Sequence, residues 1–114
     1  DTEIALLDSD GNLLAQNDDV ALNVVSSFIE IYLVPGAYYV VVWEHGDDNV
    51  IYDYTLNLFT DGCSEEVEDN DSFSLADSLG VFPSSACISG TIGIVGDVDF
   101  YSLSVASWTT LDIK

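Results

Sequence analysis

Short segments in which apolar and polar residues alternate most strongly constrain how this chain can fold. Within residues 27–33, Ile29, Ile31 and Leu33 alternate with side chains that would face the opposite way. This period of two is the pattern of a half-buried β-strand. Similar apolar or alternating segments are residues 4–7, 13–15, 37–43, 51–59, 87–94, 100–105 and 108–113. About eight short strands of this kind predict an all-β fold, an antiparallel β-sandwich resembling a jelly roll.

Local motifs indicate how the predicted strands connect. The sequence Asp-Ser-Asp-Gly at residues 8–11 is typical of a hairpin turn, because Gly accepts a positive φ and Asp side chains close Asx-turns. Residues 33–38 match the Leu-x-Pro-Gly-x-Tyr pattern of a tyrosine corner, in which a Tyr hydroxyl bonds back to the backbone. Residues 74–80 are compatible with one helical turn that ends at Gly80.

The composition sets limits on possible partners. The 114 residues, of which 48% are hydrophobic, suffice for one domain with a core. With 21 acidic residues against a single Lys, the formal net charge is −20. Nucleic acid is excluded as a partner, because binding it requires Lys and Arg to neutralise phosphates. Anionic membranes are excluded on the same grounds, and no segment is apolar enough for membrane insertion. Self-repulsion makes bound or diffuse cations expected.

Residues 65–71 are the most acidic stretch and lie between two predicted strands. Six of these seven positions carry oxygen-bearing side chains. Carboxylates packed this densely repel one another, and a hard divalent cation such as calcium, which takes about six to eight oxygen ligands, relieves the repulsion. A solvated acidic linker is the alternative interpretation.

The two cysteines, Cys63 and Cys87, flank this acidic stretch. We interpret them as a disulfide closing a loop of about 25 residues, which contributes roughly 3 kcal/mol through chain entropy. A disulfide implies an oxidising, extracytoplasmic setting. Two unpaired thiols are the alternative, whereas the CxxC spacing typical of metal or redox cysteines is missing.

Four motifs occur in a characteristic order. They are Glu-x-Glu-x-Asn-Asp at 66–71, Ala-x-x-Leu at 76–79, Gly-x-Ile at 90–92 and Asp-x-Asp-Phe-Tyr at 97–101. This order resembles the first half of the bacterial pre-peptidase C-terminal domain, to which the collagen-binding domains of bacterial collagenases are similar. Residues 1–19, 33–38 and 54–56 resemble its second half. The resemblance covers nearly the whole chain and implies a calcium-binding β-sandwich associated with secreted proteases.

The two halves stand in the opposite order to that family. Residues 1–60 resemble the second half, residues 61–73 the acidic calcium-binding linker, and residues 74–114 the first half. Three organisations are consistent with this order: one circularly permuted domain, a slice across two tandem copies, or a subunit whose halves complete the sandwiches of its neighbours. In the last two, unpaired strand edges invite pairing with another copy. Head-to-tail contacts that do not close generate a homopolymeric filament.

The resemblance also implies a set of calcium ligands, all of them the hard oxygen donors that calcium prefers. Carried over by position, they are Glu66, Glu68, Asn70, Asp71, Asp97 and Asp99. Solvated acidic turns are the alternative interpretation. Asn70 also begins an Asn-x-Ser glycosylation sequon, but an amide that binds calcium could not also carry a buried glycan.

A second cation could be held near the first predicted hairpin by Asp8, Asp10, Asp18 and Asp19. This stretch lacks the bidentate Glu of an EF-hand loop, so an ordinary turn is the preferred interpretation. His45 is the only histidine; without a second His or a paired Cys it predicts no transition-metal site. It also has no recognisable Ser or Cys nucleophile as a partner, and we expect no enzymatic activity.

Two functional hypotheses follow. The first is an extracellular, secreted or cell-surface structural module, stabilised by calcium, that forms a tandem array or filament by sharing strands with copies of itself. The second is an accessory module that holds a secreted protease to an extracellular protein or polysaccharide. A solvent-exposed row of Tyr and Trp on one sheet would favour binding, and burial of these side chains would favour the structural role.

Overall fold

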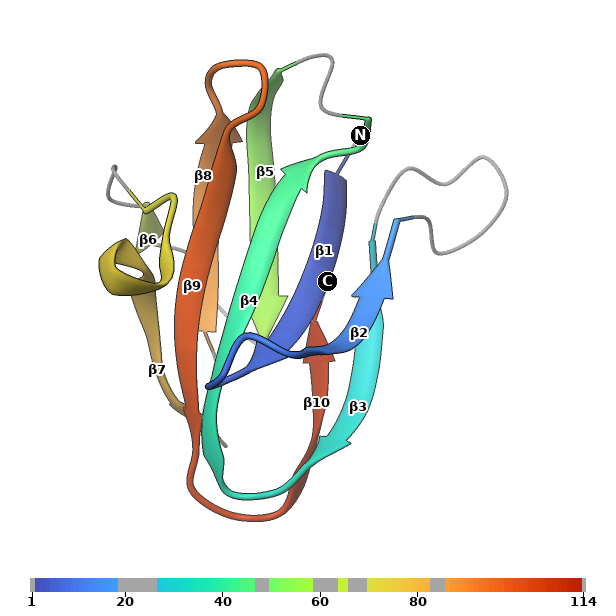
Figure 1. Cartoon of the computed structure of the whole chain (residues 1–114), viewed down its shortest axis with the longest axis vertical. Helices are drawn as coiled ribbons and strands as arrows, with labels where there is room; N and C mark the ends of the chain where they lie inside the picture. The colour runs from blue at the N-terminus through green and yellow to red at the C-terminus, as the bar shows by residue number, and fades with distance from the viewer. Residues whose placement is uncertain are drawn as a thin grey trace.

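The computed structural model describes residues 2–18, 27–46, 50–58, 64–65, 70–82 and 86–113. Within these ranges ten strands and one short 3₁₀ helix pack into two layers (Figure 1). The predicted all-β sandwich is therefore confirmed. No helix in the described ranges is long and apolar enough to cross a membrane.

One layer is a five-stranded sheet. In spatial order its strands are β2 (Leu13–Asn17), β1 (Thr2–Asp8), β4 (Gly36–Glu44), β9 (Val98–Val105) and β7 (Asp77–Phe82). β4 is the central strand, antiparallel to β1 on one side and to β9 on the other. A run of β-branched and aromatic residues, as in β4, suits such a central position.

The other layer consists of two smaller sheets. In spatial order these are β10 (Thr109–Ile113) with β3 (Ile29–Leu33), and β5 (Ile51–Leu58) with β8 (Ala86–Ile92) and β6 (Ser64–Glu65). β10 lies beside β5, which joins the two sheets into one layer. Figure 1 shows β5 and β8 behind β4 and β9.

The hydrophobic core lies between the layers. Alternate residues of strands such as β3 and β9 point inward, and Leu6, Val40, Leu56, Ile92 and Leu111 are almost completely buried. Full burial of a side chain of this size contributes about 1.5–3 kcal/mol. Strands from both halves of the sequence supply this core, so neither half has a complete core of its own.

The segment after the acidic linker differs from the prediction. The helical turn expected at 74–80 is wrong: a 3₁₀ helix, η1 (Phe73–Leu75), is followed directly by β7. A single helical turn has little stability of its own, whereas β7 gains backbone hydrogen bonds to β9 and buries Leu79. Gly80, at φ 87°, lies where the β7–β9 register shifts. Both β7 and β6 are parallel to their neighbours, whereas the other strand pairs of the sandwich are antiparallel.

Both predicted local motifs are confirmed. The Tyr38 hydroxyl donates a hydrogen bond to the carbonyl oxygen of Val34 at 2.7 Å, as in a tyrosine corner. In the β1–β2 hairpin, the Gly11 amide donates to the Asp8 carbonyl at 3.0 Å, and Gly11 has φ 85°. Only glycine adopts this conformation without a steric penalty.

The pairing of strands interleaves the two halves of the sequence. Three ladders, β3–β10, β4–β9 and β5–β8, join the first half to the second. The start of β1 also lies near the end of β10. Ile113 pairs with Ile29, and two residues before Ile29 the Ser27 hydroxyl donates to the Thr2 carbonyl oxygen at 2.5 Å.

Candidate functional site

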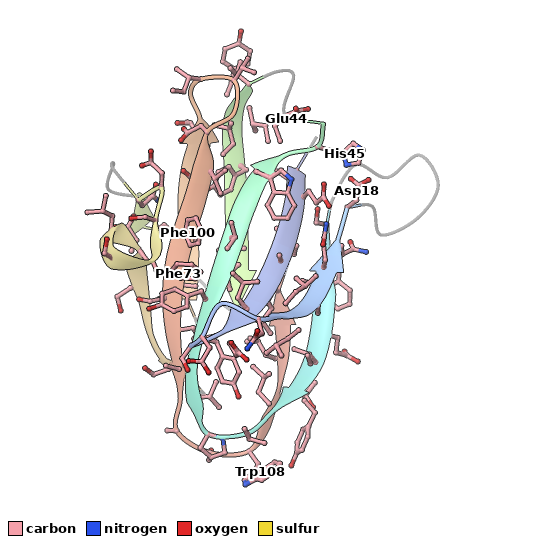
Figure 2. The ribbon with its side chains drawn as sticks, in the orientation of Figure 1. Asp18, Glu44, His45, Phe73, Phe100 and Trp108 are labelled. Atoms are coloured by element: carbon pink, nitrogen blue, oxygen red, sulfur yellow. The ribbon has the colours of Figure 1, made fainter. Side chains whose placement is uncertain are left out.

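The end of the acidic linker is fixed against the start of β9. The Phe100 amide donates a hydrogen bond to the Asn70 carbonyl oxygen at 2.7 Å. Next to this bond, the ring of Phe73 packs on Phe100 and Tyr39, with centroid distances of 4.9 and 4.8 Å (Figure 2). These contacts bring Asn70 beside Asp99, so the structure unites parts of the two stretches from which the calcium ligands were predicted.

Asp99 is a completely buried carboxyl group. It faces inward because alternate residues of β9, among them Tyr101 and Leu103, point into the core. A charged carboxylate in such a place is costly unless hydrogen-bond donors or a cation compensate for the lost water. One donor is the hydroxyl of Tyr54 on β5, which donates to Asp99 Oδ2 at 2.5 Å and also contacts the Tyr101 hydroxyl. The hydrogen bond to Asp99 links the two layers.

Tyr54 remains a hydrogen-bond donor at any ordinary pH. Burial, with the neighbouring Tyr101 and Asp99, raises the pKa of Tyr54 far above its usual value of 10.0. The phenol therefore stays protonated and can stabilise the anionic form of Asp99. Sequence reasoning missed this role, because nothing local relates Tyr54 to a residue 45 positions away.

The other predicted calcium ligands differ in their surroundings. Asn70 is completely buried, and its Nδ2 donates to Asp77 Oδ2 at 3.4 Å. Asp71 is exposed, whereas Asp97 is half-buried and its Oδ1 accepts a hydrogen bond from the Val98 amide at 3.0 Å. Glu66 and Glu68 lie outside the described residues. Among the residues that are described, no group of three or more His, Cys, Asp or Glu side chains is arranged to hold a metal ion.

The chemistry of Asn70 and Asp99 nevertheless fits calcium. Both side chains are hard oxygen donors, and the Oδ1 atom of each is buried. In this conformation the buried Asn70 amide is also inaccessible to a glycosylating enzyme. The structure thus favours a ligand or structural role for Asn70 over its use as a sequon.

Of the residues predicted for a second cation, Asp8 and Asp10 lie in one turn, and Asp18 lies apart from them. Both carboxylate oxygens of Asp8 accept hydrogen bonds in the hairpin turn, from the amides of Asp10 and Asn12 and from Asn12 Nδ2. The Asn12 side chain is the main cause that lowers the pKa of Asp8. Asp18 follows β2 at the opposite end of the hairpin, where Asn17 pairs with Ile4. Asp19 lies outside the described residues. The ordinary turn therefore accounts for Asp8.

Asp18 instead belongs to a small charged group at the edge of the first layer. His45 Nδ1 lies 3.0 Å from Glu3 Oε2 and 3.1 Å from Asp18 Oδ2 (Figure 2). The His45 side chain is half exposed. Partly exposed pairs of this kind contribute little to stability, and neither neighbour of His45 is a Ser or Cys nucleophile.

The predicted disulfide cannot be followed directly, because Cys63 lies outside the described residues. Cys87 is on β8, opposite Asn57 of β5. The parallel pairing of β6 with β8 places Ser64 opposite Ile88, and each of these two residues directly follows a cysteine in the sequence. The disulfide stays a prediction.

The chain matches no family model, no curated protein and no solved structure. The resemblance to pre-peptidase C-terminal domains therefore rests on the motifs alone.

Proposed function

We propose that this chain is an extracellular, non-enzymatic β-sandwich module of the pre-peptidase C-terminal type, stabilised by calcium, which serves as a structural repeat or filament subunit and assembles by sharing strands with its neighbours. The proposed disulfide agrees with an oxidising extracellular setting.

The interleaving of the two halves is the observation that carries this proposal. Residues 1–60 and 74–114 contribute strands to both layers, and the β3–β10, β4–β9 and β5–β8 ladders hold the halves together. The same ladders have the same registers whether the halves come from one chain or from two. Residues 61–73 join the two halves in the sequence and would be the hinge of such an exchange; exchange of identical elements about a hinge is a low-cost route to assembly.

The negative charge of the chain and its buried oxygen donors support a bound calcium ion. A net charge of −20 opposes any compact or assembled state, and a divalent cation bound at the hinge would relieve part of that repulsion. Asn70 and Asp99 would hold it, with Asp71, Asp97, Glu66 and Glu68 as the further oxygen donors implied by the motifs. When bound, the cation supplies positive charge between the linker and β9.

Strand sharing can be tested by cross-linking between chains. Ala37 on β4 and Ser104 on β9 are exposed partners in the β4–β9 ladder. Two single variants, Ala37→Cys and Ser104→Cys, are mixed after unfolding, refolded together with calcium and oxidised. Shared strands give a covalent dimer of one variant with the other, identified by peptide mass mapping. Mixed Leu7→Cys and Leu13→Cys chains are the matched control, because these partners belong to one hairpin within one half.

Electron microscopy and light scattering of the unmodified chain complete the test. We expect filaments or concentration-dependent oligomers in calcium. Monodisperse monomers at every concentration, which melt as one closed domain and give no Ala37–Ser104 cross-link between chains, would contradict strand sharing.

The calcium site is tested by thermal unfolding with and without a chelator. A ligand at a hundredfold excess over its Kd stabilises a protein by about 2.7 kcal/mol, so the chelator is expected to lower the Tm clearly. Asp99→Asn, which keeps the shape and the acceptor for Tyr54, is expected to abolish the difference. Asp10→Asn, which removes a charge from the exposed hairpin turn, is the matched control and should preserve it. A Tm that is the same with and without the chelator would refute the metal site.

The second candidate function is an accessory binding module, and one observation favours it. Tyr32 and Trp108 are both exposed and in contact with each other, while Tyr38, Tyr54 and Tyr101 are buried. An exposed aromatic pair is a common feature of recognition surfaces.

A further inference from the structure

The exposed aromatic pair lies at the end of the β3–β10 sheet. Tyr32 is 62% exposed and Trp108 is 61% exposed. Their ring centroids are 5.7 Å apart with an interplanar angle of 30°, so the two rings form a tilted, contacting pair. Trp108, in the turn before β10, lies far from Phe73 and Phe100 in Figure 2. This surface is therefore separate from the proposed calcium site.

The residues around the two rings are polar or acidic. Glu30 shares the outward face of β3 with Tyr32 and is exposed. Thr110 is the partner of Tyr32 in the β3–β10 ladder and is also exposed. Side chains on the same face of a strand or directly opposite in a ladder lie within reach of one ligand. The aromatic pair thus has a carboxylate and a hydroxyl beside it.

Charge decides which kind of ligand suits this surface. The faces of aromatic rings carry negative electrostatic potential and attract cations, and a neighbouring carboxylate adds to that attraction. The chain itself has one Lys and no Arg against 21 acidic residues, so it contains almost no cationic side chains for such a surface. A second copy has only one Lys to offer to this surface.

We infer that Tyr32, Trp108 and Glu30 form a docking surface for a cationic segment of another polypeptide, with arginine as the preferred side chain. A planar guanidinium can stack on an aromatic ring while it donates hydrogen bonds to a carboxylate, whereas the compact ammonium of lysine provides only a point charge. The inference names the partner chemistry of the second candidate function and does not depend on strand sharing.

Calorimetric titration with defined peptides tests this assignment. The probes are short Gly-Arg, Gly-Lys and Gly-Gln repeat peptides, added to the calcium-saturated chain at about 0.15 M salt, where charges beyond about 8 Å are largely screened. We expect the Gly-Arg peptide to bind most tightly, the Gly-Lys peptide more weakly and the neutral peptide not at all. Tyr32→Ala and Trp108→Ala should each weaken Gly-Arg binding about two- to thirty-fold, the range of cation–π interactions.

Tyr52→Ala is the matched control, because Tyr52 on β5 is 90% exposed and takes no part in the aromatic pair. It should change the affinity less than twofold. Glu30→Gln is an exposed and nearly isosteric change and should also weaken binding. It tests the surface even if an alanine variant loses its structure. Equal effects of Tyr52→Ala and Trp108→Ala would show diffuse charge attraction and overturn the assignment.

The same experiment distinguishes the cationic partner from two other occupants of this surface. Trp108-dependent binding of the Gly-Gln peptide or of a neutral oligosaccharide such as cellohexaose, without preference for Gly-Arg, would overturn the cationic partner. Loss of self-association in Trp108→Ala would instead assign the surface to a second copy. Cross-linking of Ala37→Cys with Ser104→Cys is measured separately, so failure of strand sharing and failure of this docking surface are distinguishable.

Discussion

Removal of the Tyr54 hydroxyl is the sharpest test of the buried polar group between the layers. In Tyr54→Phe the ring remains, but Asp99 Oδ2 loses its donor at 2.5 Å. A hydrogen bond to a charged group contributes about 1.5–3 kcal/mol to stability. Removal of the donor costs most when the acceptor is buried and left without that partner. Tyr54 is 8% exposed and Asp99 0%. We therefore expect a loss of about 2–3 kcal/mol in the free energy of unfolding, or roughly 8–12 °C in Tm for a domain of this size.

The measurement is urea unfolding followed by circular dichroism, in chelator and in saturating calcium. Tyr38→Phe is the matched control: it removes the hydroxyl of a similarly buried tyrosine, which donates to the neutral carbonyl of Val34 at 2.7 Å in a part-buried hydrogen bond, and it should lose only about 1 kcal/mol. If calcium binds Asp99, its charge replaces part of the lost donor, so calcium should reduce the loss in Tyr54→Phe but not in Tyr38→Phe. Equal losses in the two variants, unaffected by calcium, would refute the reasoning.

Three further predictions concern the first hairpin and the cysteines. Hydrogen bonds from Asn12 lower the pKa of Asp8 below its ordinary value of 3.8. These bonds to the ionised carboxylate stabilise the fold fully above pH 3.8. Their contribution is lost as the pH falls through the lowered pKa of Asp8. NMR titration should show the pKa of Asp8 returning toward 3.8 in Asn12→Ala, and an unchanged pKa would contradict the turn assignment. Gly11→Ala should cost about 1–2 kcal/mol because of the positive φ, measured by urea unfolding beside the wild type. A thiol assay of the unfolded chain should find Cys63 and Cys87 unreactive until the chain is reduced. Reduction of the disulfide should lower the free energy of unfolding by roughly 3 kcal/mol. Free thiols before reduction would exclude the disulfide.

Local sequence signals predicted those parts of the fold that depend on local physics. The alternation of residues 27–33 and 100–105, the turn after Asp8 and the tyrosine corner at Tyr38 all reflect side-chain spacing or turn chemistry within a few residues. The structure places a strand, a hairpin or a corner at each of these positions. Each feature can be recognised without knowing what the segment packs against.

Long-range contacts determined the parts that the sequence did not reveal. Residues 77–82 form a strand because β9 offers backbone partners and the core accepts Leu79, which no local pattern encodes. At the candidate site, the motifs identified Asp99, but Tyr54 becomes its partner only through the packing of one layer on the other. Likewise Asp18 faces His45 and Glu3 rather than Asp8, because the length of the hairpin separates its two ends.

The indirect link between Thr2 and Ile113, through Ser27 and Ile29, has a mechanical consequence. β1 and β10 belong to different layers, yet the start of one lies near the end of the other through Ser27. Tension applied at Thr2 and Ile113 would pull on one strand of each layer. In a closed subunit only the ladders of β1 and β10 would carry this load at first, so it should yield to a small pulling force in a single-molecule experiment. A subunit that exchanges strands with its neighbours would instead spread the load over the β3–β10, β4–β9 and β5–β8 ladders, and should resist a much larger force.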